Sequence, residues 1–240
     1  MTKLTFIAGG SKGLGAQLCN TFTNNKHHVY EFSRSGSGDR HIKCDFNDIE
    51  LTDKVTQEAF YTAHQKQLSH INLIINTAIL APFGSVAEAD TKTIKQHLNI
   101  NIESTLLLLK NFISTFQDNP AIKTVAYISS GAARRPIPGL AMYSASKAFF
   151  ERLIDTLAEE QNTKQHPMHC MTINPGIMNT DMQTEIRSQD INDFPMVYMW
   201  NEWHQQGKLA DPKDIAAICY QLISHDGENG GFYTAQDYLT

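Results

Sequence analysis

A glycine-rich turn directly after the first apolar run is the feature that most constrains the fold of this chain. Residues 4–8 are typical of a buried strand, and the segment Gly9-Gly-Ser-Lys-Gly13-Leu-Gly15 opens a helical pattern over residues 13–24. Glycines at this spacing let the backbone turn tightly and let a pyrophosphate approach the helix N-terminus. The turn therefore predicts a dinucleotide site at the first strand, with a plain strand-to-helix turn as the alternative.

Short apolar runs alternate with longer helical patterns along the rest of the chain. The runs that indicate strands are residues 29–33, 42–44, 71–75, 124–129 and 168–173, and the helical patterns cover residues 50–67, 90–116, 142–161 and 212–224. This order is typical of right-handed βαβ units around a parallel sheet. No repeat, low-complexity tract or shift in composition marks a boundary, so we expect one doubly wound α/β domain over residues 1–240.

The composition narrows the class of partner. Hydrophobic residues make up 41% of the 240 residues, charged residues make up 19%, and the formal net charge is −5. These values are typical of a soluble globular protein that is large enough for a substantial core. Because there is no basic block, neither a nucleic acid nor an anionic membrane surface is an expected partner. We therefore expect a small molecule as the partner.

Three further features argue against other classes of protein. The longest leucine run, 106–109, is too short to span a membrane. The N-terminus leads straight into the glycine turn without room for a signal peptide, so we expect a cytoplasmic protein. The 4 cysteines have no paired spacing, which favours free thiols, and the 10 histidines show no metal-ligand spacing, so no metal site is expected.

A tyrosine and a lysine lie four residues apart in the segment Tyr143-Ser-Ala-Ser-Lys147. On a helix this spacing puts both side chains on one face, about one turn apart. A free phenol has a pKa of about 10, and a nearby cation lowers that pKa. The pair predicts a tyrosine tuned for proton transfer to or from a carbonyl oxygen. Such a pair also arises by chance, so its weight depends on the glycine turn upstream.

The glycine turn and the Tyr-Lys pair occur together in a known family. The chain resembles the classical short-chain dehydrogenase/reductases, whose T-G-x-x-x-G-x-G pattern is matched from Ala8 to Gly15 except at its first position. The resemblance implies a Rossmann fold with a seven-stranded parallel sheet and helices on both faces. The family's Asn-Asn-Ala-Gly segment appears here as Asn76-Thr77-Ala78-Ile79. The implied cofactor contacts in these two motifs are Gly9, Ser11, Lys12, Gly13, Leu14, Gly15, Asn76 and Ala78.

The resemblance also implies the remaining catalytic residues. The family's serine lies 13 residues before its tyrosine, which is Ser130 here, and its asparagine matches Asn101 by flanking residues, with Asn99 as the nearby competitor. In the family's mechanism Tyr143 would protonate the carbonyl oxygen, Ser130 would orient that oxygen, and Asn101 would support a water path. Lys147 would lower the tyrosine pKa and hold the hydroxyls of the nicotinamide ribose.

The end of the second strand decides the expected cofactor. NAD enzymes place an acid there, whereas NADP enzymes place an arginine near the 2′-phosphate. Arg34 follows the run 29–33, and Lys12 adds a second cation in the glycine turn. The sequence therefore predicts NADP(H), with two solvated surface cations as the alternative. By resemblance, the other cofactor contacts are Asp45, Pro175, Gly176 and Thr180.

Within the family the chain is most similar to the sepiapterin reductase and benzil reductase branch. The similarity lies in Ser129-Ser-Gly-Ala-Ala133 and in the segment Pro175-Gly-Ile-Met-Asn-Thr-Asp-Met-Gln183. The aspartate by which sepiapterin reductases hold the pterin falls at Thr234, a neutral side chain that cannot pair with an amino-pterin as a carboxylate does. The resemblance implies an NADPH-dependent carbonyl reductase whose small-molecule substrate is a vicinal dicarbonyl or an aromatic ketone.

Two groups of residues have more than one interpretation. The large side chains between residues 194 and 203 belong to a segment, 176–210, that we expect to be irregular. They suit a lid over the substrate, a part of the core or a subunit interface. Arg134 and Arg135 follow the predicted serine, and they are either solvated or placed to steer an anionic substrate.

Two alternative functions and the oligomeric state stay open. The fold alone is also compatible with a regulator that binds NADP(H) without turnover, and the motifs are compatible with an NAD-linked alcohol dehydrogenase. Relatives commonly pair through the helices that match residues 90–116 and 142–161, and the leucine run 106–109 supplies an apolar face. We therefore expect a homodimer or a homotetramer.

Overall fold

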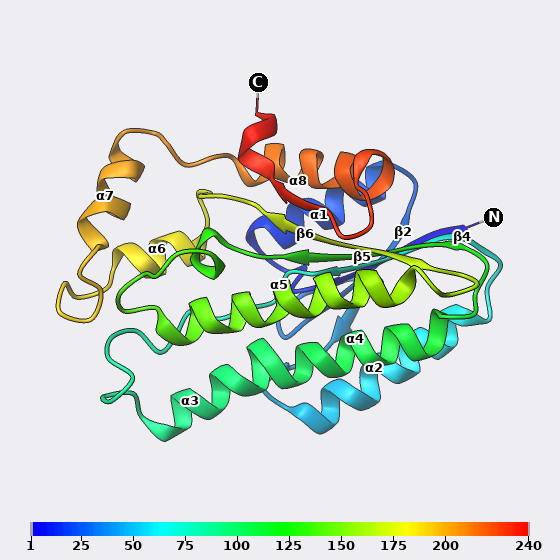
Figure 1. Cartoon of the computed structure of the whole chain (residues 1–240), viewed down its shortest axis with the longest axis horizontal. Coiled ribbons are helices and arrows are strands. Elements are labelled where there is room, and N and C mark those ends of the chain that lie inside the picture. The colour runs from blue at the N-terminus through cyan, green and yellow to red at the C-terminus, as the bar shows by residue number, and fades with distance from the viewer. Residues whose placement is uncertain (1, 240) are drawn as a thin grey trace.

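Seven parallel strands form the central sheet of the protein, for which a computed structural model describes residues 2–239 (Figure 1). The spatial order is β3-β2-β1-β4-β5-β6-β7. In that order the strands are His41–Lys43, His28–Ser33, Thr2–Ala8, Leu68–Ile75, Ile122–Ile128, Met168–Asn174 and Phe232–Thr234. The chain winds outward from β1 in both directions, which confirms the doubly wound fold predicted from the alternating pattern.

The sheet is buried on both faces, and its strands alternate between two cores. Phe6 and Ile7 are consecutive residues of β1, yet Phe6 lies in one apolar cluster and Ile7 in the other. Phe6 packs with Phe60 of α2 (Ile49–His64), and their ring centroids lie 4.8 Å apart. The first core also takes residues from α4 (Ser104–Phe116) and α5 (Ala141–Gln161), and the second takes residues from α1 (Gly13–Asn24) and α8 (Pro212–Gln221).

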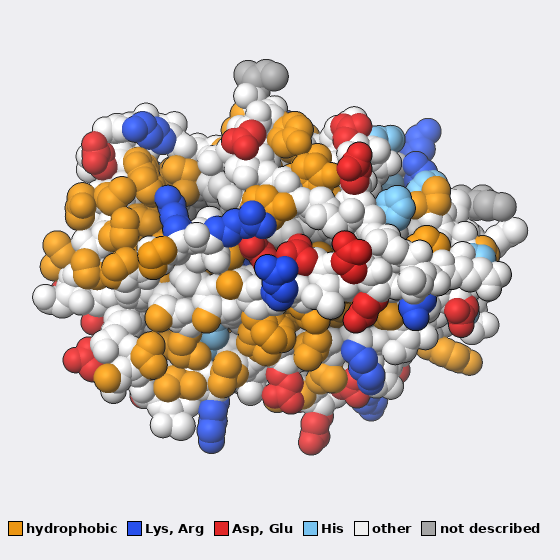
Figure 2. Space-filling model, viewed as in Figure 1, with side chains coloured by type: hydrophobic (Ala, Val, Ile, Leu, Met, Phe, Trp, Pro, Cys, Tyr) orange, Lys and Arg blue, Asp and Glu red, His pale blue; other side chains and the backbone are white. Residues whose placement is uncertain are grey.

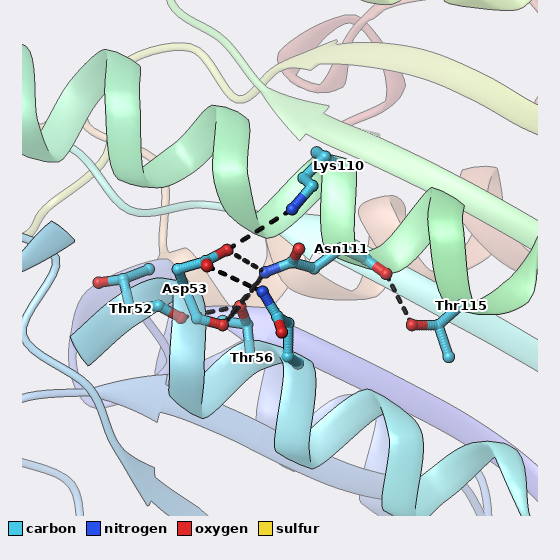
Figure 3. A network of polar contacts seen from close by, with 7 residues as sticks. Thr52, Asp53, Thr56, Lys110, Asn111 and Thr115 are labelled. Atoms are coloured by element: carbon cyan, nitrogen blue, oxygen red, sulfur yellow. Dashed lines mark hydrogen bonds and ion pairs between the residues drawn. The ribbon is translucent and has the colours of Figure 1, made fainter. Parts of the chain in front are cut away.

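A polar network fixes α4 against α2 (Figure 3). The side-chain amide of Asn111 donates to the Asp53 carboxylate at 3.0 Å, to the Asp53 carbonyl at 3.2 Å and to the Thr56 hydroxyl at 2.8 Å. This hydrogen bonding is the main reason why the pKa of Asp53 is lowered. Asn111 is buried, so these bonds specify the register of the two helices and hold the second half of α4 against the first half of α2.

The pattern over residues 90–116, which we expected to be one helix, forms continuous helical backbone with a π-helical turn in its middle. It forms α3 (Thr91–Leu98), a π-helical turn (Asn99–Glu103) and then α4. A second π-helical turn, Leu222–Asp226, follows α8. A π-helical turn adds one residue to a single turn of the helix, and the spacing of apolar residues along the helix changes little. The sequence pattern therefore does not reveal such a turn.

The segment 176–210 is more ordered than we expected. It contains α6 (Asp181–Arg187) and α7 (Val197–Gln205). The side chain of Thr180 caps α6 by accepting a hydrogen bond from the backbone N–H of Gln183. The prediction of an irregular segment was therefore wrong for these helices, because they are too short for the helical period to stand out against their neighbours.

Candidate active site

A cleft of about 930 Å³ opens at the carboxyl ends of the strands, where the connecting loops meet. It brings together most of the site residues predicted from the sequence. Those in its lining are Gly9, Lys12, Gly13, Leu14, Arg34, Asn76, Ala78, Ser130, Tyr143, Lys147, Pro175, Gly176 and Thr180. Ser11, Gly15, Asp45 and Asn101 do not line it.

The glycine turn has the backbone geometry that a phosphate cradle requires. Gly9 and Gly13 adopt positive φ angles of 79° and 51°, which are costly for other residues. A Cβ atom at Gly15 would lie 1.9 Å from the Gly9 carbonyl oxygen, so Gly15 permits close packing of helix and turn. At the N-terminus of α1 no side chain caps the free N–H groups. The turn therefore fits a pyrophosphate, which those N–H groups and the helix dipole would attract.

Asn76 connects the glycine turn to the middle of the sheet. Its backbone N–H donates to the Ala8 carbonyl at 3.1 Å, and its side chain donates to the Gly9 carbonyl at 2.9 Å. These two bonds join the end of β4 to the end of β1. Thr77, which the sequence did not single out, also lines the cleft. A Cβ atom on Gly9 would lie only 3.0 Å from the Thr77 Cα, so the two backbones pack closely here.

Arg34 extends into the cleft from a loop that a buried carboxylate holds in place. Glu31 Oε1 lies 2.7 Å from His41 Nδ1 and accepts a hydrogen bond from the Ser33 hydroxyl at 3.2 Å. The Gly36 N–H in turn donates to the Ser33 hydroxyl at 3.0 Å. The loop between β2 and β3 is therefore folded over buried Glu31 and half-buried His41, and Arg34 is exposed at the start of this loop.

Of three other predicted cofactor residues, Lys12 lines the cleft, whereas Ser11 and Asp45 do not. Lys12 reaches across the cleft mouth, where its ammonium lies 3.8 Å from the Asp181 carboxylate, and both side chains are exposed. Asp45 caps its own turn by accepting a hydrogen bond from the Asn47 N–H at 3.0 Å. Ser11 and Asp45 therefore stay predictions, since neither lines the cleft.

Ser130, Tyr143 and Lys147 converge at the centre of the cleft. Ser130 follows β5, and the other two residues lie one turn apart on α5. Lys147 Nζ donates to the Ile128 carbonyl at 2.7 Å and lies 5.7 Å from the ring centroid of Tyr143. The end of β5 and the buried face of α5 thus position one hydroxyl, one phenol and one amine around a common space.

The expected lowering of the tyrosine pKa by the lysine is wrong for the protein by itself. Burial raises the pKa of Tyr143 to about 12, and the Ser130 hydroxyl acts in the opposite direction. Burial also lowers the pKa of Lys147 to about 7, an effect that Glu151 opposes. The Lys147 amine is directed at the Ile128 carbonyl, and burial, rather than this amine, dominates the pKa of Tyr143.

Asn101 lies behind the cleft rather than in it. Its side chain occupies the π-helical turn, is 5% exposed, and exchanges two hydrogen bonds of 2.8 Å with the backbone of Ile79. Its Nδ2 also lies 3.1 Å from Nε2 of buried His97. The competitor Asn99 instead donates to the Asn47 carbonyl at 3.2 Å near the surface. The structure therefore directs Asn101 inward and Asn99 outward.

The aromatic cluster of residues 194–203 packs as a small core, and its inner side forms the far wall of the cleft. Phe194 and Trp200 are buried with ring centroids 5.1 Å apart, and Trp200 and Trp203 both line the cleft. Tyr198, by contrast, is 60% exposed. Apolar side chains gather over the α6–α7 end of the molecule (Figure 2). The cluster is thus both core and cleft wall.

The two adjacent arginines have different surroundings. Arg134 Nε donates to the Glu151 carboxylate at 2.8 Å, and its guanidinium lies 3.3 Å from the ring centroid of Phe232. Arg135 lines the cleft. Its Nε would lie 3.8 Å from a Cβ atom placed on Gly131, which is an ordinary van der Waals distance. Arg134 is therefore engaged, whereas Arg135 stands beside the residue that follows Ser130.

Besides Thr77, sequence reasoning missed other polar residues in and near the cleft. Gln183 and Gln236 line the cleft, and Oε1 of buried Gln183 has no hydrogen-bonding partner among residues 2–239. Gln236 donates to the Ile177 carbonyl at 3.0 Å, while its neighbour Thr234 does not line the cleft. Glu151 was also missed, although its spacing of four residues from Lys147 is visible in the sequence.

Residues 2–239 were also expected to contain neither a membrane span nor a metal site. No helix there has the length and apolar character to cross a membrane. No group of three or more His, Cys, Asp and Glu side chains in the same residues is arranged to hold a metal ion.

The parallel sheet, the glycine turn and the Ser-Tyr-Lys arrangement define a nucleotide-dependent oxidoreductase. The chain belongs to the short chain dehydrogenase family, whose model matches residues 3–191. It is 30% identical to a benzil reductase ((S)-benzoin forming) of Bacillus subtilis over 242 residues, which cover 99% of this chain and 100% of that relative. It is 28% identical to a sepiapterin reductase of Bos taurus over 165 residues, which cover 66% of this chain and 59% of that relative. The resemblance to this branch is confirmed.

Solved structures show the same fold. The YIR035C short chain dehydrogenase/reductase of Saccharomyces cerevisiae superposes with a TM-score of 0.83 at 23% identity, covering 98% of this chain and 97% of that one. ElxO with NADP bound superposes with a TM-score of 0.77 at 24% identity and the same coverage of 98% and 97%. These likenesses confirm the Rossmann-type architecture with its sheet order.

Proposed function

We propose that this oxidoreductase is an NADPH-dependent carbonyl reductase whose substrate is a vicinal dicarbonyl or an aromatic ketone. The observation that carries the proposal is the convergence of Ser130, Tyr143 and Lys147 in one cleft. One side of that cleft is the glycine turn, and the other is the wall that contains Trp200 and Trp203. An aromatic wall suits a flat apolar substrate, and the benzil reductase relative supports a diketone.

The side chains of the site have distinct tasks in this reaction. The nicotinamide supplies the hydride when the cofactor is bound. The Ser130 hydroxyl holds the carbonyl oxygen and stabilises the charge that develops on it. Tyr143 gives that oxygen a proton, and because burial raises its pKa to about 12, the phenol carries that proton at neutral pH. Lys147 holds the cofactor ribose, and Asn101 keeps the Ile79 backbone in place behind the site.

The proposed cofactor is NADP(H). Arg34 lines the cleft at the end of β2, where an arginine suits the 2′-phosphate, and Lys12 adds positive charge at the mouth. The two serines beside Arg34 leave that position without the carboxylate that binds an unphosphorylated ribose. The glycine turn, Asn76 and the segment from Pro175 to Thr180 would hold the rest of the cofactor.

We also propose a single-domain cytoplasmic protein that forms a homodimer or a homotetramer. Helices α3, α4 and α5 expose apolar side chains: Leu98 is 46%, Leu106 38% and Phe149 43% exposed. A second copy packed against α4 and α5 would cover these side chains.

Turnover of a small panel of ketones tests the proposal. Benzil, an aliphatic diketone and a simple aryl ketone are incubated with the purified protein and with NADPH or NADH in parallel. We expect consumption of NADPH with benzil and slow or no consumption of NADH. Consumption of NADH alone would favour the NAD-linked alcohol dehydrogenase, and tight NADPH binding with no turnover of any ketone would favour the regulator.

A further inference from the structure

The buried face of α5 carries three ionisable side chains in a row. Tyr143, Lys147 and Glu151 follow one another at intervals of four residues, so they lie one above another on the same face of the helix. Their exposed fractions are 6%, 3% and 7%. A buried carboxylate is costly unless it is paired and hydrogen-bonded, so the presence of Glu151 in this row calls for a specific role.

The Glu151 carboxylate is fully engaged by groups on both sides of the site. One oxygen accepts a hydrogen bond from the Ser129 hydroxyl at 2.5 Å, and the other accepts one from Arg134 Nε at 2.8 Å. Ser129 precedes Ser130 in the chain, so the first bond fixes the backbone that presents the Ser130 hydroxyl. Because both oxygens are held, the carboxylate has a defined position, one turn of α5 from Lys147 and paired with Arg134.

The ionisable groups around Lys147 leave Glu151 as its source of negative charge. Two tyrosines and a histidine also face Lys147: Tyr143 on its own helix, Tyr127 on β5 with its ring centroid 4.9 Å from Nζ, and His97 on α3. Burial raises the pKa of both phenols and lowers the pKa of His97, so all three are neutral at pH 7. Among residues 2–239, Glu151 is the acidic group that opposes the loss of the Lys147 charge.

We infer that Glu151 is a positioning residue for the proposed reduction, because its buried carboxylate lies one helical turn from Lys147 and, through Ser129, holds the backbone that carries Ser130. The inference rests on the proposed function for its catalytic consequence. Its electrostatic part concerns the protein alone. Without the carboxylate, we expect the buried amine to lose its proton at lower pH, so that the cofactor ribose loses this cation at pH values where the wild type retains it.

A pH profile of Glu151→Gln tests the catalytic part. In wild type, we expect kcat/KM for benzil with NADPH to fall on the alkaline side as Lys147 loses its proton. We expect this limb to move to lower pH by about one unit in Glu151→Gln, the scale of one buried charge partner. The loss is then about tenfold on the alkaline side and shrinks as the pH falls. Glu151→Asp keeps the charge and should restore part of the shift.

Two controls separate charge from structure. Glu160→Gln removes an exposed carboxylate from the same helix and should leave the profile in place. Ser129→Ala removes the hydrogen bond to the backbone near Ser130 but keeps the Glu151 charge. It should lower kcat without moving the limb. A profile that does not move in Glu151→Gln, or that moves equally in Ser129→Ala, would overturn the inference.

A direct titration makes the electrostatic test independent of turnover. The Lys147 amine is followed by NMR of labelled lysine side chains in wild type and in Glu151→Gln, and its signal is assigned from its absence in Lys147→Arg. We expect the midpoint to fall by about one pH unit in Glu151→Gln. An unchanged midpoint contradicts the role of Glu151, whatever the activity. A shifted midpoint in a protein that reduces no ketone would sink the proposed function and keep the electrostatic inference.

Discussion

The two ends of the cleft are built in different ways. The cofactor end is mainly backbone: the Gly9–Gly15 turn, the free N-terminus of α1 and the Asn76 bonds that connect β1 to β4. The substrate end is mainly side chains, which α6, α7 and the aromatic cluster bring to the cleft. Backbone geometry needs particular residues at fixed spacing, whereas an apolar wall accepts many sequences of similar volume. The cofactor end of the cleft is therefore easier to predict from a sequence than the substrate end.

Removal of the Tyr143 hydroxyl should have the largest effect, because this group belongs to neither end alone. We expect Tyr143→Phe to lower kcat for benzil reduction by about 10³-fold, as expected for loss of a general acid, with little change in NADPH affinity. Kinetics and a fluorescence titration of NADPH check the two parts. Unchanged turnover would show that the centre of the cleft was assigned wrongly.

Arg34 tests the cofactor end. In Arg34→Asp we expect the KM for NADPH to rise by about 10- to 100-fold, since a charged hydrogen bond to phosphate is lost and a repulsion is added. The KM for NADH should stay the same or fall. Arg40→Asp is the matched control, because Arg40 lies in the same loop but donates to the Thr23 hydroxyl at 2.6 Å and does not line the cleft. Equal losses in both variants would refute the role of Arg34.

Trp203 tests the substrate end. It is only partly buried, so Trp203→Ala should fold, whereas Trp200 is deeper in the cluster. We expect the KM for benzil to rise by about tenfold in Trp203→Ala, because an aromatic contact of roughly 1 kcal/mol and some buried area are lost. NADPH affinity should not change. Tyr198→Ala, on the exposed side of the same helix, is the control, and a similar rise there would break the distinction between wall and surface.

The smallest expected effect concerns the support of the Arg34 loop. Glu31→Gln keeps the shape of the buried side chain but removes the charge that pairs with His41. We expect a rise of about threefold in the KM for NADPH, since one charge-assisted bond becomes neutral, and no change for NADH. His41→Gln should give a similar rise. A loss of affinity for both cofactors would instead indicate a general disturbance of the loop.

Much of the architecture and the centre of the site could be predicted from the sequence, for physical reasons. The alternation of strands and helices follows from burial on both faces of the sheet, and the glycine turn tolerates few substitutes. Ser130, Tyr143 and Lys147 could be predicted as catalytic residues because carbonyl reduction requires those residue types at that spacing. All three line the cleft.

Other features of the fold and of the site could not be predicted from the sequence. The π-helical turn that directs Asn101 inward changes the helical repeat by one residue, and α6 and α7 are too short for a clear period. The effect of burial on the pKa of Tyr143 and of Lys147 depends on the whole surrounding structure. For that reason the expected lowering of the Tyr143 pKa was wrong, although both residues were placed correctly on one helix face.

Hydride transfer itself tests the central claim most directly. NADPH carrying deuterium on one face of the nicotinamide C4 is incubated with the protein and benzil, and the benzoin product is analysed by mass spectrometry. The proposed reaction predicts one deuterium in benzoin from one of the two C4-labelled cofactors and none from the other, with little product from labelled NADH. Product without deuterium from either form, or labelled product from NADH alone, would contradict an NADPH-dependent carbonyl reductase.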